Sequence, residues 1–275
     1  MPNNLTIAEQ LLYSTIKIIS VKQRVAFGTG TGFFSAFNRT RDSFAPVLVT
    51  NKHVIKGADS ISIKCHLQEP ISGGPSGRYL NINLPLQNLV IPHPNENVDL
   101  CAILVGDALN QANTDGNQIF YSNIEMGIIP VEDEWQYLDA IEEVTMIGCP
   151  NGISDEANNF PLVRQGITAS NPSKRYNGKN EFVVDMACFP GSSGSPIFLY
   201  NPFGYFNKRT GNFQIGEGRL KLLGILYAGP LISNTGQITL NTKPSVEMNS
   251  PMHLGFAIRS SELIELERYF ITLIR

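Results

Sequence analysis

The segment Phe189-Pro190-Gly191-Ser192-Ser193-Gly194-Ser195-Pro196 says more about this chain than any other stretch. Small residues surround Ser193, and the apolar residues 197–200 follow at once. Glycines permit backbone dihedrals that turn successive N–H groups toward one point, where they can stabilise a negative charge beside the Ser193 hydroxyl. A Gly/Ser surface turn before a strand would have the same composition, so the segment alone leaves both interpretations open.

A base and an acid for this serine can be sought among few residues. A serine hydroxyl is a weak nucleophile until a base takes its proton, and the chain has only four histidines. His53 follows the apolar run 47–49 after three polar residues, and Asp99 directly precedes the apolar run 100–104. Taken singly, each also has an ordinary structural explanation, as a core histidine and as a strand-edge carboxylate.

The rest of the chain indicates an all-β protein. Its 24 Gly and 17 Pro separate many short runs of β-branched and aromatic residues, a pattern typical of a sandwich or barrel. Strands do not alternate regularly with amphipathic helices, which argues against a doubly wound α/β fold. The end of the chain differs, because four apolar residues recur there at helical spacing: Leu263, Leu266, Phe270 and Ile274.

In the order His53, Asp99, Ser193, the sequence resembles the trypsin-like (chymotrypsin-fold) serine peptidases. The glycine-rich run 27–34 resembles an early strand of the family's bacterial branch, and residues 254–258 resemble the last strand of the high-temperature-requirement proteases. Gly194-Ser195-Pro196 resembles the glutamyl endopeptidases at the same place. The likeness covers about residues 14–260.

The resemblance implies two antiparallel six-stranded β-barrels with the active site in the cleft between them, followed by a C-terminal helix. We expect residues 1–115 to form the first barrel, with His53 and Asp99. Residues 116–259 would form the second barrel, with Ser193, and residues 260–275 the helix. Residues 106–120 are polar and rich in turn formers, and are the expected linker.

The same resemblance implies the roles of the residues. His53 takes the Ser193 proton, Asp99 orients the imidazole, and the N–H groups of Gly191 and Ser193 form the oxyanion hole. The family's digestive members have Asp where this chain has Ser192, and they need a freed N-terminus to pair with it. We therefore expect the oxyanion loop to form without N-terminal processing.

Specificity is predicted only from position in the family. The expected substrate-binding residues include the pocket floor at Ala187 and Cys188, a wall that pairs with the substrate backbone at Tyr227, Ala228 and Gly229, and a far wall at Gly255. An added strand is a common way to hold a peptide. No acid stands at the floor, which disfavours a Lys or Arg preference and favours a neutral, apolar P1 residue. A glutamate preference has no evident basic partner except His253.

Composition excludes several classes of protein. A net charge of −3 gives no basic field for nucleic acid, and no apolar run approaches the length of a membrane span. Four widely spaced cysteines without a C-x-x-C motif are interpreted as free thiols in a reducing, cytoplasmic compartment. The first twenty residues lack the features of a secretory signal. We expect a polypeptide substrate, no cofactor and no metal.

Other sites and classes were weighed. An α/β-hydrolase needs Ser, acid and His in that order, whereas this chain has them in the order His53, Asp99, Ser193. His53, His66 and His93 lack the spacing of metal ligands. Cys188 is a poor candidate nucleophile because it lies outside the nucleophile loop. The glycines at 28, 30 and 32 do not continue into a dinucleotide-binding helix. The main alternative is a non-catalytic or latent binding module on the same fold, with insertion 201–219 or 230–251 blocking the cleft. Regulation by a partner protein or by latency is expected, because a free peptidase endangers its host.

Overall fold

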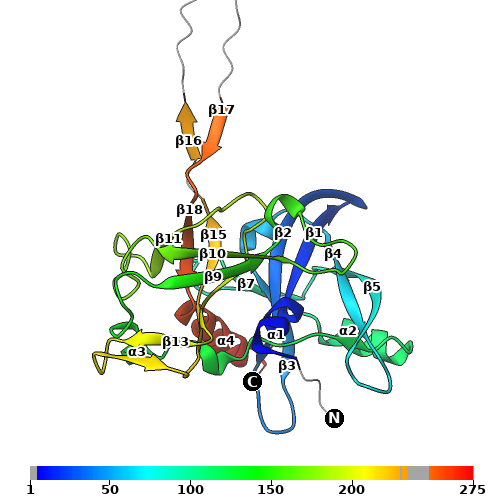
Figure 1. The fold of residues 1–275 in the computed structure, drawn as a ribbon. Coiled ribbons are helices and arrows are strands. Elements are labelled where there is room, and N and C mark those ends of the chain that lie inside the picture. Colours follow the sequence, from blue (N-terminus) through cyan, green and yellow to red (C-terminus); the bar gives the residue numbers. More distant parts are fainter. Residues whose placement is uncertain (1–4, 230, 235–247, 275) are drawn as a thin grey trace, which may run out of the picture.

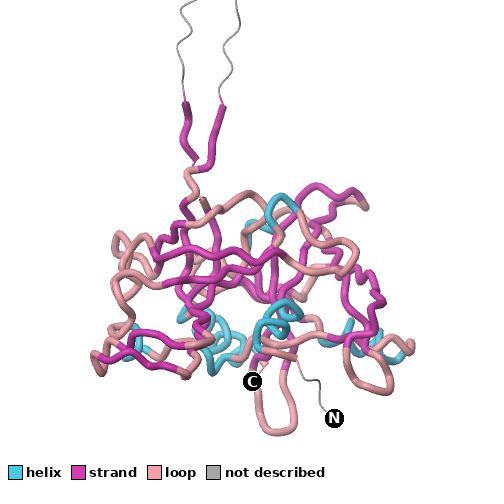
Figure 2. The backbone as a smooth tube through the Cα atoms, viewed as in Figure 1, coloured by secondary structure: helices cyan, strands magenta, loops and turns pink. Residues whose placement is uncertain are grey.

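The protein is described by a computed structural model in residues 5–229, 231–234 and 248–274. Strands fill two adjoining halves of the molecule, while helices α1 to α4 lie along the lower side in the view of Figures 1 and 2. The protein is therefore mostly β, as the spacing of Gly and Pro predicted. Among the described residues, no helix is both long and apolar enough to cross a bilayer.

The N-terminal half is one antiparallel sheet of eight strands. The hydrogen-bonded order is β5-β4-β1-β2-β3-β7-β6, with β8 pairing beside β4. In chain order these elements are α1 (Ile7–Ser14), β1 (Thr15–Lys22), β2 (Val25–Phe37), β3 (Ala45–Thr50), η1 (Lys52–Ile55), β4 (Ser60–Gln68), β5 (Pro75–Pro85), β6 (Val90–Pro92), β7 (Cys101–Leu104), α2 (Gly106–Thr114) and β8 (Ile119–Phe120).

The C-terminal half contains a closed barrel of six strands, in the order β10-β11-β18-β15-β12-β9. Two hairpins, β13–β14 and β16–β17, are attached to it. The elements are η2 (Met126–Ile128), α3 (Glu132–Trp135), β9 (Glu143–Gly148), η3 (Pro150–Gly152), β10 (Leu162–Thr168), β11 (Glu181–Asp185), β12 (Pro196–Asn201), β13 (Gly204–Asn207), β14 (Asn212–Ile215), β15 (Arg219–Ala228), β16 (Leu231–Asn234), β17 (Met248–Pro251), β18 (Leu254–Arg259) and α4 (Ser261–Leu273).

One apolar core joins the two halves. It contains buried residues of both, such as Phe33 and Val49 from the first sheet and Phe198 from the barrel. The C-terminal helix α4 packs into this core through Leu263, Leu266 and Phe270. The predicted C-terminal helix is thus confirmed, although Ile274 follows its last turn and is 54% exposed. The buried apolar area of α4 stabilises the arrangement of the halves.

The predicted pair of six-stranded barrels is confirmed for one half only. In the described residues of the N-terminal half, the sheet path ends at β5 and β6 and is not closed into a barrel. The expected linker 106–120 forms helix α2 and strand β8, because the polar run still contains Ala112 and Ile119, which are buried in the first sheet's core. Insertion 201–219 forms the β13–β14 hairpin, and residues 230 and 235–247 of the second insertion lie outside the described part.

Candidate active site

His53 and Asp99 are brought together by the pairing of β3 with β7. In that register Thr50 lies opposite Cys101. His53 comes three residues after Thr50, in η1, and Asp99 comes two residues before Cys101. The glycine-rich run of β2 lets η1 sit close, since a Cβ on Gly30 would lie 2.4 Å from a methyl of Val54. The glycines therefore fix the place of the helix turn that carries His53.

The two side chains are in direct contact. His53 Nδ1 meets Asp99 Oδ2, and the His53 backbone N–H donates to Asp99 Oδ1 at 3.0 Å. Asn51 Nδ2 donates to the Asp99 carbonyl at 2.7 Å. Burial raises the pKa of the Asp99 carboxyl, but the hydrogen bonds and charge of His53 lower it by more, so it lies below its usual value. Asp99 is therefore ionised at neutral pH and faces the imidazole.

The Ser193 loop is seated against the first sheet. Gly191 and Gly194 have φ angles of +86° and +89°, which only glycine adopts without strain. Thr31 N–H donates to the Ser193 carbonyl at 2.8 Å, and Thr31 Oγ1 donates to the Gly191 carbonyl at 2.9 Å. A Cβ on Gly194 would lie 1.9 Å from the Thr31 carbonyl oxygen. Strand β2 of the first sheet thus holds a loop of the barrel in place.

The N–H groups in the loop differ in their partners. Those of Ser192, Gly194 and Ser195 donate to the carbonyls of Phe189, Leu226 and Ser192 at 2.8–3.0 Å. Within the described ranges, the N–H groups of Gly191 and Ser193 donate to no protein acceptor. These two donors are the pair that sequence analysis assigned to the oxyanion hole, and they are available to an anion.

The Ser193 hydroxyl does not yet contact the imidazole. Its Oγ donates to the Tyr227 carbonyl at 3.4 Å, and among the residues that the structure describes no hydrogen bond joins it to His53. The Ser192 and Ser195 hydroxyls of the same loop are fully buried and have no hydrogen-bond partner in the part of the chain that the structure describes. Ser193 is therefore the loop serine whose hydroxyl can turn toward a base.

Comparison with known proteins agrees with this geometry. The trypsin-like peptidase domain model matches residues 30–201, a span that includes His53, Asp99 and Ser193. The chain belongs to the trypsin-like peptidase family. It is a trypsin-like serine protease, a hydrolase. No curated protein matches it.

Among solved structures, the peptidase is similar to a serine endoprotease from Yersinia pestis. The two share 17% identity with a TM-score of 0.46, and the match covers 97% of this chain and 68% of that one.

Residues 151–156 also contact the loop that carries Ser193. Asn151 N–H donates to the Pro190 carbonyl at 2.5 Å, and a Cβ on Gly191 would lie 2.9 Å from Asn151 N. The same segment is tied to the first sheet, because Lys17 pairs with Glu156 and donates to the Gly152 carbonyl at 3.3 Å. The loop that carries Ser192 and Ser193 is thus held by contacts within the chain.

The predicted substrate-binding residues lie near one another. A Cβ on Gly255 would lie 2.5 Å from Cys188 Sγ, and one on Gly229 would lie 3.7 Å from Cys188 Cβ. Ala228 pairs with Phe256 across β15 and β18, and Tyr227 accepts from Ser193. These positions surround the loop.

Arg164 is the neighbour that sequence reasoning missed. Its guanidinium donates to the carbonyl of Ala187, the predicted pocket floor, and stacks over the Phe189 ring at 4.9 Å from its centroid. Within the described residues it has no carboxylate partner. Its place on β10, paired with β9 rather than with the loop, left no signal in the sequence. Thr31 was likewise noted only as part of a glycine-rich strand.

The other candidates do not assemble. Burial raises the pKa of the Cys188 thiol to about 11, so it is protonated at neutral pH and a poor nucleophile. All four cysteines are buried and free, as predicted. The three histidines of the possible metal site have different partners: His53 contacts Asp99, His66 the Asn159 carbonyl, and His93 the Glu262 carboxylate.

Proposed function

We propose that this peptidase is a serine endopeptidase that hydrolyses peptide bonds through an acyl-enzyme, with His53, Asp99 and Ser193 as its triad. The contact between His53 and Asp99 carries the proposal, because an ionised carboxylate fixes the imidazole with its other nitrogen free to act as a base. The two N–H groups of Gly191 and Ser193, without acceptors in the described chain, support the oxyanion hole.

The chemistry follows from these groups. Ser193 Oγ attacks the carbonyl carbon as its proton passes to His53 Nε2, and the oxyanion accepts from Gly191 and Ser193 N–H. His53 then protonates the leaving amine, and the C–N bond breaks. A water molecule, deprotonated by His53, attacks the acyl-enzyme, and the returning proton restores the Ser193 hydroxyl. Each oxyanion donor contributes about 3 kcal/mol.

The resting position of Ser193 supports regulation. Its hydroxyl has to leave the Tyr227 carbonyl before it can donate to His53. We propose that this turn is the last step of activation, through a partner or release from latency. The alternative function is a non-catalytic or latent binding module, in which the hydroxyl keeps its present partner.

Several sequence expectations remain part of the proposal. The substrate would lie in a cleft between the first sheet and the barrel. The N-terminal sheet would form a barrel through contacts other than its hydrogen-bonded strand pairs. We also propose domain limits at 115 and 259 and a polypeptide substrate. Four free cysteines support a cytoplasmic location.

The position of Arg164 favours acidic P1 residues. The neutral floor at Ala187 suits an apolar side chain, as the sequence predicts. The guanidinium beside that floor, with no carboxylate partner in the described residues, supplies the basic group that a glutamate preference lacked. We therefore propose that acidic P1 residues are accepted, with Arg164 as the specificity determinant.

The test of the proposed function compares two neighbouring serines. Ser193→Ala is expected to lower kcat on quenched-fluorescent peptides by about a million-fold with the fold intact, since a nucleophile is lost. Ser195→Ala, at a buried hydroxyl without a partner, is the matched control and is expected to retain turnover. Full activity in the Ser193→Ala variant would refute the assignment. Peptide binding without cleavage by the unmodified chain would favour the binding module.

A further inference from the structure

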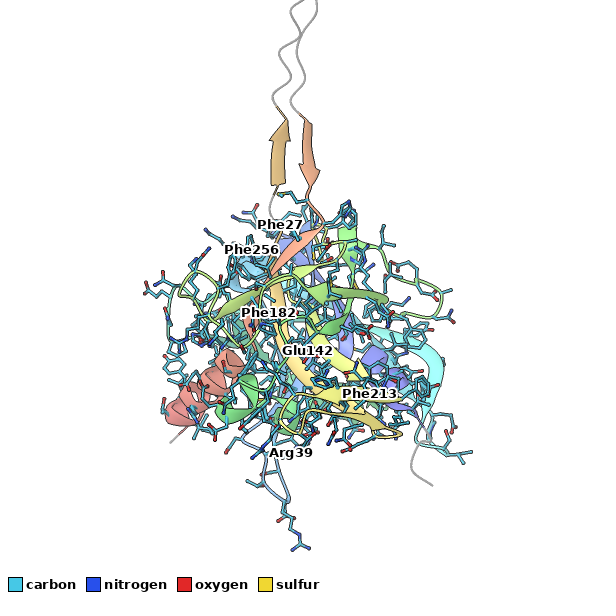
Figure 3. The ribbon with its side chains drawn as sticks, turned by 60° about the vertical axis from the view of Figure 1, so that its left-hand side comes forward. Phe27, Arg39, Glu142, Phe182, Phe213 and Phe256 are labelled. Atoms are coloured by element: carbon cyan, nitrogen blue, oxygen red, sulfur yellow. The ribbon has the colours of Figure 1, made fainter. Side chains whose placement is uncertain are left out.

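The β13–β14 hairpin presents an apolar face to solvent. Register places Phe206 opposite Phe213 and Gly204 opposite Ile215, so these side chains share one face. That face is 46% exposed at Phe206, 63% at Phe213 and 85% at Ile215, and Phe203 beside it is 85% exposed. Figure 3 shows Phe213 on this hairpin, below Phe182 of the barrel interior.

The inner face of the hairpin is the polar one. Tyr205 and Gln214 alternate with the exposed residues, and the Tyr205 ring lies 4.6 Å from the Arg219 guanidinium. A hairpin that only covered its own protein would turn its apolar face inward. We call Phe203, Phe206, Phe213 and Ile215 the outer face of the hairpin. Contiguous exposed apolar side chains of this kind mark interaction sites.

A cavity of about 220 Å³ lies between the hairpin and the α3 segment. Its walls include four cations and one carboxylate: Lys208, Arg209, Arg219, Lys221 and Glu134. Two of the cations are neutralised, since Lys221 pairs with Glu134 at 2.8 Å and Arg219 pairs with Glu142.

The remaining two cations have no acid in the described chain. Lys208 donates to the Leu138 carbonyl at 2.9 Å, and Arg209 stacks over the Tyr137 ring. Both lie at the turn of the hairpin, next to the outer face. A ligand that supplies a carboxylate would complement this cavity, and an apolar neighbour on that ligand would cover the outer face.

We propose that the outer face and this cavity together bind an extended peptide segment of a partner protein, one with large apolar side chains beside an Asp or Glu. A second copy of the chain fits poorly, because a two-fold contact would bring Lys208 and Arg209 toward their own equivalents. A lipid surface is the other occupant that the test below distinguishes, since headgroups would contact Lys208 and Arg209 without entering the cavity.

The hairpin is also connected to the catalytic loop. Strand β12 begins three residues after Ser193 and leads to the hairpin, and β15 returns from the hairpin to Tyr227, whose carbonyl holds the Ser193 hydroxyl. The paired part of β12 is 6 residues long, or about 20 Å, and the docked peptide lies at the end of it that is far from the nucleophile. A regulatory partner of the kind expected from sequence can bind here without entering the substrate site.

Binding is tested on the full chain with Ser193→Ala, so that no probe is cleaved and a failure leaves the proposed function untouched. The probes are four sets of blocked, fluorescein-labelled decapeptides: Asp/Leu/Phe, Lys/Leu/Phe, Ser/Leu/Phe and Asp/Ser. Fluorescence anisotropy is expected to rank Asp/Leu/Phe first, with Kd on the order of 10 μM. Phe213→Ser with Ile215→Ser, and separately Lys208→Glu with Arg209→Glu, are expected to weaken binding about tenfold or more.

The matched control is Ile71→Ser, at a side chain 96% exposed elsewhere, which is expected to bind as the parent does. Circular dichroism checks that the surface variants remain folded. The proposal is overturned if no set binds at roughly 1 mM, if the Lys set binds as tightly as the Asp set, or if both double variants bind unchanged. Loss of a dimer in sedimentation, or loss of binding to phosphatidylglycerol vesicles, on Phe213→Ser would assign the face to a second copy or to lipid instead.

Discussion

The proposed base and the proposed nucleophile of this peptidase are fixed in different ways. His53 follows β3 and Asp99 precedes β7, two paired strands of one sheet, and their register brings the two side chains into contact. Ser193 lies in the other half, and its loop is seated by contacts that cross between the halves, through Thr31 and Asn151. Its hydroxyl meets a carbonyl rather than the imidazole. One half of the site is therefore preassembled, and the other depends on how the two halves meet.

Asp99→Asn breaks the preassembled half and has the largest expected effect among the following changes. The amide cannot stabilise the imidazolium and favours the wrong tautomer, so kcat is expected to fall about 10⁴-fold. Steady-state hydrolysis of a fluorogenic peptide measures it. Asp42→Asn, at an exposed side chain, is the control, and equal losses in both variants would argue against a triad role for Asp99.

Gly194→Ala breaks the seating of the nucleophile loop. The new Cβ would lie 1.9 Å from the Thr31 carbonyl oxygen, so the loop has to move, and a shift of about 1 Å costs about 10²-fold in rate. Gly57→Ala is the matched control, because Gly57 also has a positive φ (+77°) but nothing lies within 4 Å of its new Cβ. The control is expected to lose about 1 kcal/mol of stability and no kcat. Equal kcat in the two variants would mean that the loop tolerates displacement.

Arg164→Leu tests the proposed preference for acidic P1 residues beside the same loop. If the guanidinium beside Ala187 selects acidic P1 residues, kcat/KM for a P1 Glu substrate falls about 10- to 100-fold while that for P1 Leu is maintained or rises. The measurement is the ratio of the two kcat/KM values in parent and variant. A parent that cleaves after Leu and not after Glu, with an unchanged ratio in the variant, would leave the apolar P1 interpretation standing.

The smallest expected effect is on the free energy of unfolding, through a contact between the two halves. His93, beyond β6, lies 3.0 Å from the Glu262 carboxylate of α4. The hydrogen bond from His93 lowers the pKa of Glu262 below its usual 4.5, although burial opposes this. A carboxyl whose pKa is lowered on folding adds stability above its unfolded pKa, and that stability is lost as the pH falls through the lower, folded pKa.

Glu262→Gln is therefore expected to lose on the order of 1 kcal/mol of unfolding free energy at pH 7. Urea unfolding of parent and variant should differ above about pH 4.5 and converge below it. A gap that stays constant into strong acid would show that the ion pair is not the cause. Glu265→Gln, at a side chain 53% exposed on the same helix, is the control.

Much of the fold could be predicted, because the alternation of short apolar runs and turn formers is a local property. The helix at 261–273 followed from the spacing of Leu263, Leu266 and Phe270. The free state of the four cysteines followed from their wide separation in the sequence. Closure of a sheet depends on strand pairing over long distances, which no local pattern encodes. The N-terminal barrel is accordingly a prediction that the hydrogen-bonded path does not confirm.

The candidate site divides in the same way. Residue type and order sufficed to select His53, Asp99 and Ser193 as candidates. The partners that seat or tune them could not be selected, because Thr31 and Arg164 act through a few contacts with a loop that lies far from them in the sequence. The exposed outer face of the hairpin was also invisible, since Phe206 and Phe213 look like ordinary core residues until their register and exposure are known.

The central claim, that a fixed imidazole–carboxylate pair activates the Ser193 hydroxyl, is tested most directly by labelling with a fluorophosphonate and mapping the modified peptide by mass spectrometry. We predict one label per chain, on Ser193 within residues 189–196, absent in Ser193→Ala and strongly slowed in His53→Ala. Label on another residue, or equal labelling with and without the His53 side chain, would contradict it.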